Sequence, residues 1–118
     1  MCFTITTAGF DSPLSRALRA LAPECAAPVR ALRAGDLKAS EPLWAALINA
    51  AAAHALEYDD SYRAGLYHPG APIVSAAFSA ACRVKAPGSV LLTAMVAGYE
   101  ASLRIAAAVN PSHYRLWH

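Results

Sequence analysis

Paired cysteines and runs of like charge are both missing from this sequence. Its three cysteines, Cys2, Cys25 and Cys82, are far apart and odd in number, so they lack the spaced pairs of a zinc site or a disulfide framework. They are typical of buried apolar residues in a reducing compartment. The 10 basic and 8 acidic residues are scattered along the chain, and no stretch could follow a phosphate backbone. Nucleic acid is therefore not expected as a partner.

Long apolar runs and several well-known enzyme motifs are absent as well. No stretch reaches the roughly 18 uninterrupted apolar residues that a membrane span needs, and the first residues, MCFTITTAGF, lack the basic start of a signal peptide. We expect a cytoplasmic protein without a membrane partner. The sequence has no glycine-rich phosphate loop, no G-x-S-x-G elbow and no C-x-x-C pair, which removes several common enzyme classes.

What the sequence has in abundance is apolar residues. Hydrophobic residues make up 57% of the 118 positions and charged residues only 15%, so apolar side chains must cover more than one face of each helix. The length suffices for one domain with a modest core of its own. We expect its apolar helices to pack against further protein, and therefore a homo-oligomer.

Apolar spacing, proline and possible capping residues predict four helices, over residues 13–21, 43–56, 73–84 and 89–109. Ser12, Ser40 and Ser89 are suitable N-caps. The helix over 43–56 is apolar on nearly every side, which predicts a central position in a bundle. Residues 1–12 have no helix start signal. Residues 23–38 are predicted to be a connector with a brief strand or helical turn at Val29 and Leu32 and a turn at Gly35-Asp36, and 111–118 a loop.

The stretch from His54 to Pro72 carries most of the groups capable of proton chemistry. Glu57, Asp59 and Asp60 lie within four residues, Ser61 follows, and His68 stands in a loop bordered by glycine and proline. Crowded carboxylates raise at least one pKa and can supply an acid or base near neutral pH. The other interpretation is a solvated helix end followed by an Asp-Ser turn. The residues alone leave both interpretations open.

The remaining polar residues have simpler interpretations. His54 and Glu57 share a helix face, but one such pair is not enough for a metal site, and a core histidine is the favoured interpretation. Glu100 and Arg104, four residues apart, predict a structural ion pair. His113 and His118 could be metal ligands, which would need further carboxylates or histidines, or one of them could be a general base, and the residues do not decide between these roles.

Four stretches follow one another along the chain: NAAAAHALEYDDSY, HPGAPIVSAAFSAA, LLTAMVAGYEASLRIAAAV and PSHYRLWH. In this order they resemble the motifs of the MmgE/PrpD family, which includes 2-methylcitrate dehydratase, cis-aconitate decarboxylase and an iminodisuccinate epimerase. The resemblance is strong over residues 39–118 and weaker over 1–38, where TITTAGFDSP resembles the end of an early family helix. It implies an all-α helical bundle corresponding to part of the helical domain of a larger enzyme, usually a homodimer, with an α/β lid domain and without a metal or organic cofactor.

The resemblance also implies site residues. Matched to the family motifs by position, Glu57 supplies an acid, Ser61 a substrate-binding hydroxyl, and His68 and His118 two catalytic histidines, with Asp60 beside them as a further catalytic acid. Glu57 stands where aspartate is commoner in the family and Ser61 where threonine is common. The lysines and tyrosine with which the family holds substrate carboxylates have no counterpart in these motifs.

These residues fit a lyase or isomerase acting on a small di- or tricarboxylic acid. Such a reaction needs a base for a proton next to a carboxylate and an acid for the leaving group or carbanion. His68 and His118 can take these roles in either assignment, with Glu57 and Asp60 orienting them. Dehydration, decarboxylation and epimerisation all stay open. The alternative is a truncated, non-catalytic fragment or pseudoenzyme that self-associates through its apolar helices.

Overall fold

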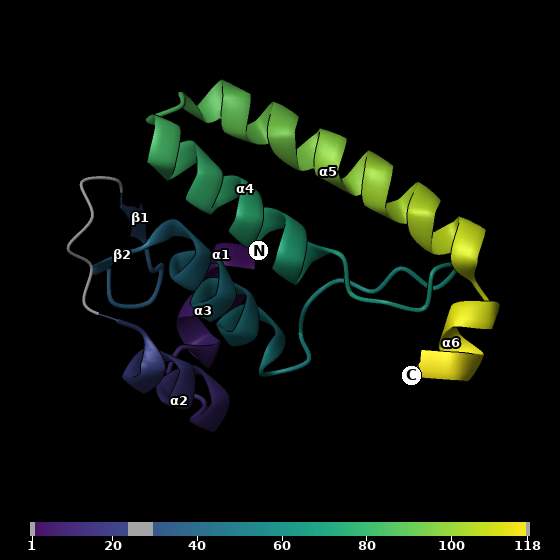
Figure 1. The fold of residues 1–118 in the computed structure, drawn as a ribbon, viewed down its shortest axis with the longest axis horizontal. Helices are drawn as coiled ribbons and strands as arrows, with labels where there is room; N and C mark the ends of the chain where they lie inside the picture. Colours follow the sequence, from purple (N-terminus) through teal and green to yellow (C-terminus); the bar gives the residue numbers. More distant parts are fainter. Residues whose placement is uncertain (1, 24–29, 118) are drawn as a thin grey trace.

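The computed structural model describes residues 2–23 and 30–117, and within them the fold is all-α, as predicted (Figure 1). The helices are α1 (Cys2–Gly9), α2 (Pro13–Leu21), α3 (Pro42–His54), α4 (Gly70–Val84), α5 (Gly88–Val109) and α6 (Ser112–Trp117). Two short strands, β1 (Ala31–Leu32) and β2 (Ala39–Ser40), form an antiparallel pair. His118, predicted to be a catalytic histidine, lies outside the described residues.

Helix α3 is the centre of the fold, as its apolar sequence predicted. Ala45, Ile48, Ala52 and Ala53 are fully buried, and Ile48 packs with Ala52 and Phe10 in the core. Helices α1, α2 and α4 all contact α3. Its alanines allow close approach, because small side chains let helix backbones come together. The end of α3, from which the polar loop departs, is therefore held from several sides.

Helix α1 shows how tight this packing is. A Cβ on Gly9 would lie 2.0 Å from the carbonyl oxygen of Ala52. The sequence has no helix start signal here, although TITTAGFDSP resembles the end of a family helix, and within α1 the hydroxyls of Thr6 and Thr7 donate to carbonyls one turn back. Packing of α1 against α3, rather than a capping residue, stabilises this helix.

The N-caps of the helices were predicted with mixed success. Ser12 does cap α2, with its hydroxyl accepting from the Ser15 N–H at 3.2 Å. Ser40 was the wrong choice for α3: it lies in β2, and the carboxylate of Glu41 accepts the Leu43 N–H at 2.9 Å instead. Ser89 was also wrong, because α5 begins one residue earlier, directly after a proline, without a side-chain cap.

The connector is a small hairpin fastened to α3. Leu32 does lie in a strand, and the turn at Gly35-Asp36 is confirmed, whereas Val29 lies outside the described residues. The side-chain amide of Asn49 donates to the Leu32 carbonyl at 3.0 Å, and its oxygen accepts the Ala34 N–H at 2.8 Å. Asn49, the polar residue in the middle of the apolar helix, thus holds the hairpin.

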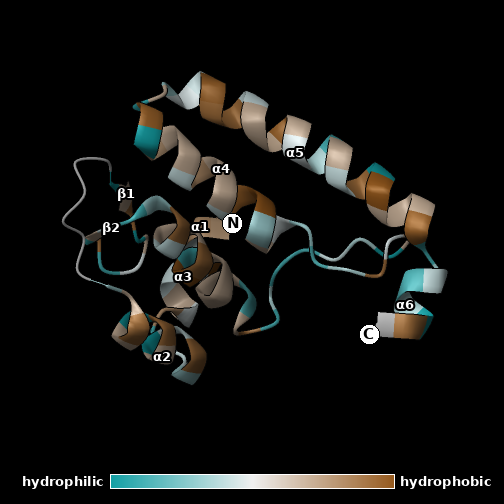
Figure 2. Ribbon diagram, in the orientation of Figure 1, coloured by the Kyte–Doolittle hydropathy of each residue, from teal (hydrophilic) through white to brown (hydrophobic). Residues whose placement is uncertain are grey.

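Helix α5 runs along the outer side of α4, and although most of its residues are apolar, none of them is buried within the described chain (Figures 1 and 2). Its large exposed apolar residues are Val90, Leu92, Val96, Ile105 and Val109. By length and composition alone its 22 residues could cross a membrane, a property shared with core helices of soluble proteins. The predicted ion pair between Glu100 and Arg104 is present on this helix, with 2.6 Å from Arg104 Nε to Glu100 Oε1.

Helix α6 replaces the loop predicted over residues 111–118. The chain turns at Asn110, whose side-chain amide donates to the Ala64 carbonyl at 2.8 Å. The Ser112 hydroxyl donates to the Val109 carbonyl at 2.7 Å. The Asn110 bond connects the far end of α5 to the loop between α3 and α4, whereas the Ser112 bond is local to the start of α6.

Candidate functional site

The loop between α3 and α4 carries the candidate site. Helix α3 ends at His54, and the chain reverses through Glu57, which has a left-handed backbone with φ of 54°. The Glu57 N–H donates to the His54 carbonyl at 3.0 Å. Farther on, the Tyr62 N–H donates to the Tyr67 carbonyl at 2.9 Å and closes a tight turn. This path brings His68 back beside the end of α3.

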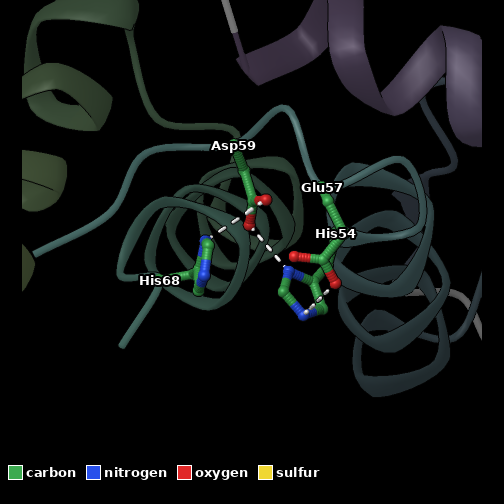
Figure 3. Close-up of side chains that lie close together, drawn as sticks. All are labelled: His54, Glu57, Asp59 and His68. Carbon is green, nitrogen blue, oxygen red and sulfur yellow. Dashed lines mark hydrogen bonds and ion pairs between the residues drawn. The ribbon is translucent and has the colours of Figure 1, made fainter. Parts of the chain in front are cut away.

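Asp59 lies between two histidines (Figure 3). Its side chain is only 2% exposed. Oδ2 lies 2.9 Å from His54 Nδ1, and Oδ1 lies 3.4 Å from His68 Nδ1. The ring centroids of His54 and His68 are 5.0 Å apart. Glu57 stands on the outer side of His54, with Oε1 3.6 Å from Nε2.

Asp60, the neighbouring carboxylate, faces another part of the fold. Oδ1 accepts the Gly70 N–H at 2.8 Å and Oδ2 accepts the Tyr99 hydroxyl at 3.0 Å. A Cβ on Gly70 would lie 2.2 Å from Oδ1, so this approach requires glycine. Burial raises the pKa of Tyr99, and its hydrogen bond to Asp60 raises it further. Asp60 thereby joins the loop to the start of α4 and to the middle of α5.

An open cleft of about 960 Å³ lies between this loop, α5 and α6. Its polar lining is made by His54, Ser61, Tyr67, His68, Ser102, Asn110, His113 and Tyr114. Ser61, the predicted substrate-binding hydroxyl, therefore lies on the same cleft as His68. A ligand of the size of a small carboxylic acid fits within this volume.

The sequence-predicted site residues are thus partly brought together. His68, Ser61 and Glu57 belong to one neighbourhood, whereas the Asp60 oxygens bond elsewhere. Sequence reasoning gave Asp59 no role of its own and favoured a core position for His54, which is in fact half exposed at the cleft. Of the two C-terminal candidates, His113 lines the cleft. The Glu57, Asp59 and Asp60 cluster was the signal for this region, but adjacent loop residues carry no periodicity to show which way each one points.

The same groups could hold a divalent metal ion. His54, Glu57, Asp59 and His68 each offer one ligand atom, and these atoms lie within 4.8 Å of one another. Two imidazoles and two carboxylates are a ligand set that suits zinc and similar ions. Of these four residues, the sequence argument considered only His54 and Glu57 as ligands, because Asp59 and His68 join them through the fold of the loop.

The pKa of His54 is raised from its ordinary value by the hydrogen bond to Asp59. Partial burial opposes this rise, and charge attraction by Asp59 and Glu57 adds to it.

The raised pKa of His54 makes the stability of the fold depend on pH. The stabilisation is fully present below the unfolded pKa of about 6.5, and it is lost as the pH rises through the folded pKa. We expect an NMR titration to place the His54 pKa above 6.5 and to show it falling in Asp59→Asn. Equal values in the two proteins would contradict the assignment.

Comparison with known proteins agrees with these motifs. The family model for the MmgE/PrpD N-terminal domain matches residues 2–118. The chain therefore belongs to the MmgE/PrpD family, whose members are enzymes of the dehydratase and lyase type. No curated protein and no solved structure matches the chain.

Proposed function

We propose that the protein catalyses a lyase or isomerase reaction on a small di- or tricarboxylic acid, with 2-methylcitrate dehydration as the reference reaction, by histidine-based proton transfer. The observation that carries the proposal is the position of His68: it lines the cleft while its Nδ1 is turned toward the buried carboxylate of Asp59. Family membership supports the reaction class. A histidine held in this way has one nitrogen left for substrate.

In this proposal His68 and His118 act as base and acid in either assignment. Glu57 adds negative charge beside His54, and the Ser61 hydroxyl donates a hydrogen bond to the substrate. Asp60 serves the site by holding the loop to α4 and α5 through Gly70 and Tyr99. We also propose that the reaction uses no metal and no organic cofactor and takes place in the cytoplasm.

The direct test is a substrate panel. The purified protein is incubated with 2-methylcitrate, cis-aconitate and iminodisuccinate in D₂O, and product formation and deuterium uptake next to the carboxylates are followed by NMR. We expect one class of acid to be converted, and the product identifies dehydration, decarboxylation or epimerisation. Absence of both conversion and exchange with every acid would overturn the proposal and favour the non-catalytic alternative.

We further propose that a second copy of the chain covers the outer face of α5. Val96 is 70% exposed among other apolar side chains, and soluble proteins rarely leave such a face open. Hydrogen bonds from Tyr99 to Asp60 and between Ser102 and Tyr67 hold the opposite side of α5 to the protein, which favours a protein partner over a bilayer.

Light scattering on the eluting protein should therefore give at least twice the chain mass of 12.4 kDa. Val96→Glu should lower that mass, because a charge in an apolar contact is costly. The matched variant Ala20→Glu, at an exposed site on α2, should not. A wild-type monomer, or binding of the protein to neutral lipid vesicles, would contradict the homo-oligomer.

A further inference from the structure

Asp59 is the one acid of the loop with an oxygen directed at each of two histidines. Oδ2 lies 2.9 Å from His54 Nδ1 and Oδ1 lies 3.4 Å from His68 Nδ1 (Figure 3). We propose that Asp59 is the positioning residue of the site: it holds both imidazoles by their Nδ1 atoms and leaves Nε2 of His68 for the substrate. The catalytic meaning of this inference rests on the proposed function, whereas its structural content does not.

The burial of Asp59 supports this role. Its side chain is 98% buried by area, since only 2% is exposed, and a buried carboxylate requires hydrogen-bond donors. Among the described residues, Asp59 Oδ1 and His68 Nδ1 are both buried atoms without a hydrogen-bond partner, and they face each other. A small rotation of the His68 ring satisfies both atoms at once. The His54 side of the carboxylate already has its hydrogen bond.

The neighbouring acids do not offer this geometry. Asp60 uses one oxygen for the Gly70 N–H and the other for the Tyr99 hydroxyl. Glu57 is 71% exposed and lies 3.6 Å from Nε2 of His54. Solvent weakens such an exposed pair, so Glu57 cannot fix a ring orientation as a buried carboxylate does. The positioning role therefore falls on the residue between them.

The contacts with Asp59 determine which nitrogen of each histidine ring carries the proton. An ionised carboxylate only accepts, so each histidine must present Nδ1–H to Asp59, and in its neutral form each ring then carries a bare Nε2. Nε2 of His68 can take a proton from a substrate carbon, leaving the electron pair on that carbon. The resulting imidazolium is stabilised by the adjacent carboxylate of Asp59.

The test uses the chain labelled with ¹⁵N in histidine only, which marks four residues. The ¹⁵N shifts of a neutral imidazole report which nitrogen carries the proton. In the wild type we expect His54 and His68 both to be protonated on Nδ1. In Asp59→Asn an amide oxygen can accept from one ring, but the amide nitrogen must donate to the other, so at least one ring should change its tautomer.

Asp60→Asn is the matched variant, because it changes the adjacent carboxylate in the same way. It should lower thermal stability through the loss of the Gly70 and Tyr99 contacts and leave the tautomers of both histidines unchanged. Nε2–H tautomers on both rings of the wild type would overturn the proposal, whether or not either variant folds. So would wild-type tautomers in a folded Asp59→Asn.

Activity provides a separate readout. If an acid of the panel is converted, Asp59→Asn should lower kcat on the order of 10²-fold, change KM little and shift the pH dependence of kcat. The reason is that the variant still binds the substrate but no longer holds the base in the correct orientation. An unchanged kcat overturns the positioning role. If no acid of the panel is converted, the proposed function fails, while the ¹⁵N spectra still decide whether Asp59 holds both rings.

Discussion

Replacement of His68 by glutamine should lower kcat by about 10²–10⁴-fold, the usual contribution of a positioned general acid or base. Glutamine keeps a polar side chain of similar reach, but its amide is neither protonated nor deprotonated near neutral pH and so cannot act as an acid or a base. His68 stands 3.4 Å from Asp59 and lines the cleft, so its loss removes the proton-transfer group without opening the core. Steady-state kinetics on the converted acid measures the effect.

The control for this replacement is Glu100→Gln. Glu100 pairs with Arg104 on an exposed side of α5, and surface ion pairs contribute at most about 1 kcal/mol. We expect wild-type kcat from this variant. Circular dichroism and the melting temperature establish that both proteins are folded. A folded His68→Gln with full activity would remove His68 from the chemistry and with it the proposed mechanism.

Substitution of Gly9 by alanine should destabilise the fold by about 3 kcal/mol, at the upper end of the usual penalty for overpacking. The added Cβ would lie 2.0 Å from the carbonyl oxygen of Ala52, and a backbone atom cannot turn away as a flexible side chain can. Helices α1 and α3 must separate to admit it. The free energy of unfolding, obtained from urea denaturation, measures the loss.

Gly88→Ala is the matched substitution, since a Cβ at Gly88 meets nothing within 4 Å. Alanine is favoured over glycine in helices by up to about 1 kcal/mol, so this variant should be neutral or slightly more stable. Equal effects of the two changes would mean that the contact between Gly9 and Ala52 is not a tight one. Because Ala52 lies two residues before His54, we also expect Gly9→Ala to disturb the histidine cluster.

Local signals in the sequence were sufficient for much of the fold. Ser12 and Pro13 mark the start of α2, and the apolar composition of 43–56 placed α3 at the centre. Helix α1 has no such signal because its stability comes from contacts with α3, which are distant in sequence. Ser40 had the right chemistry for a cap, but it is taken up by the pairing with β1, and Glu41 takes that place.

The candidate site was predictable as a region but not as an arrangement. Glu57, Ser61 and His68 were found from their motif, and the structure brings them to one neighbourhood. Asp59 faces the histidines and Asp60 faces α4 and α5 because of the path of the loop, which is held by the hydrogen bonds of Gly70 and Tyr99 to Asp60. No rule of spacing decides which of two adjacent acids faces the histidines, because that choice is made by tertiary contacts.

The left-handed backbone of Glu57 affects which residues should persist at position 57 as the gene evolves. Residues other than glycine adopt this conformation at a cost of about 1 kcal/mol, and glycine would adopt it freely. Apart from the charge that Glu57 places beside His54, the fold gains nothing from an acid at this position. In gene copies released from selection for catalysis, position 57 should drift toward glycine or asparagine. An acid that persists there records continuing use of the site.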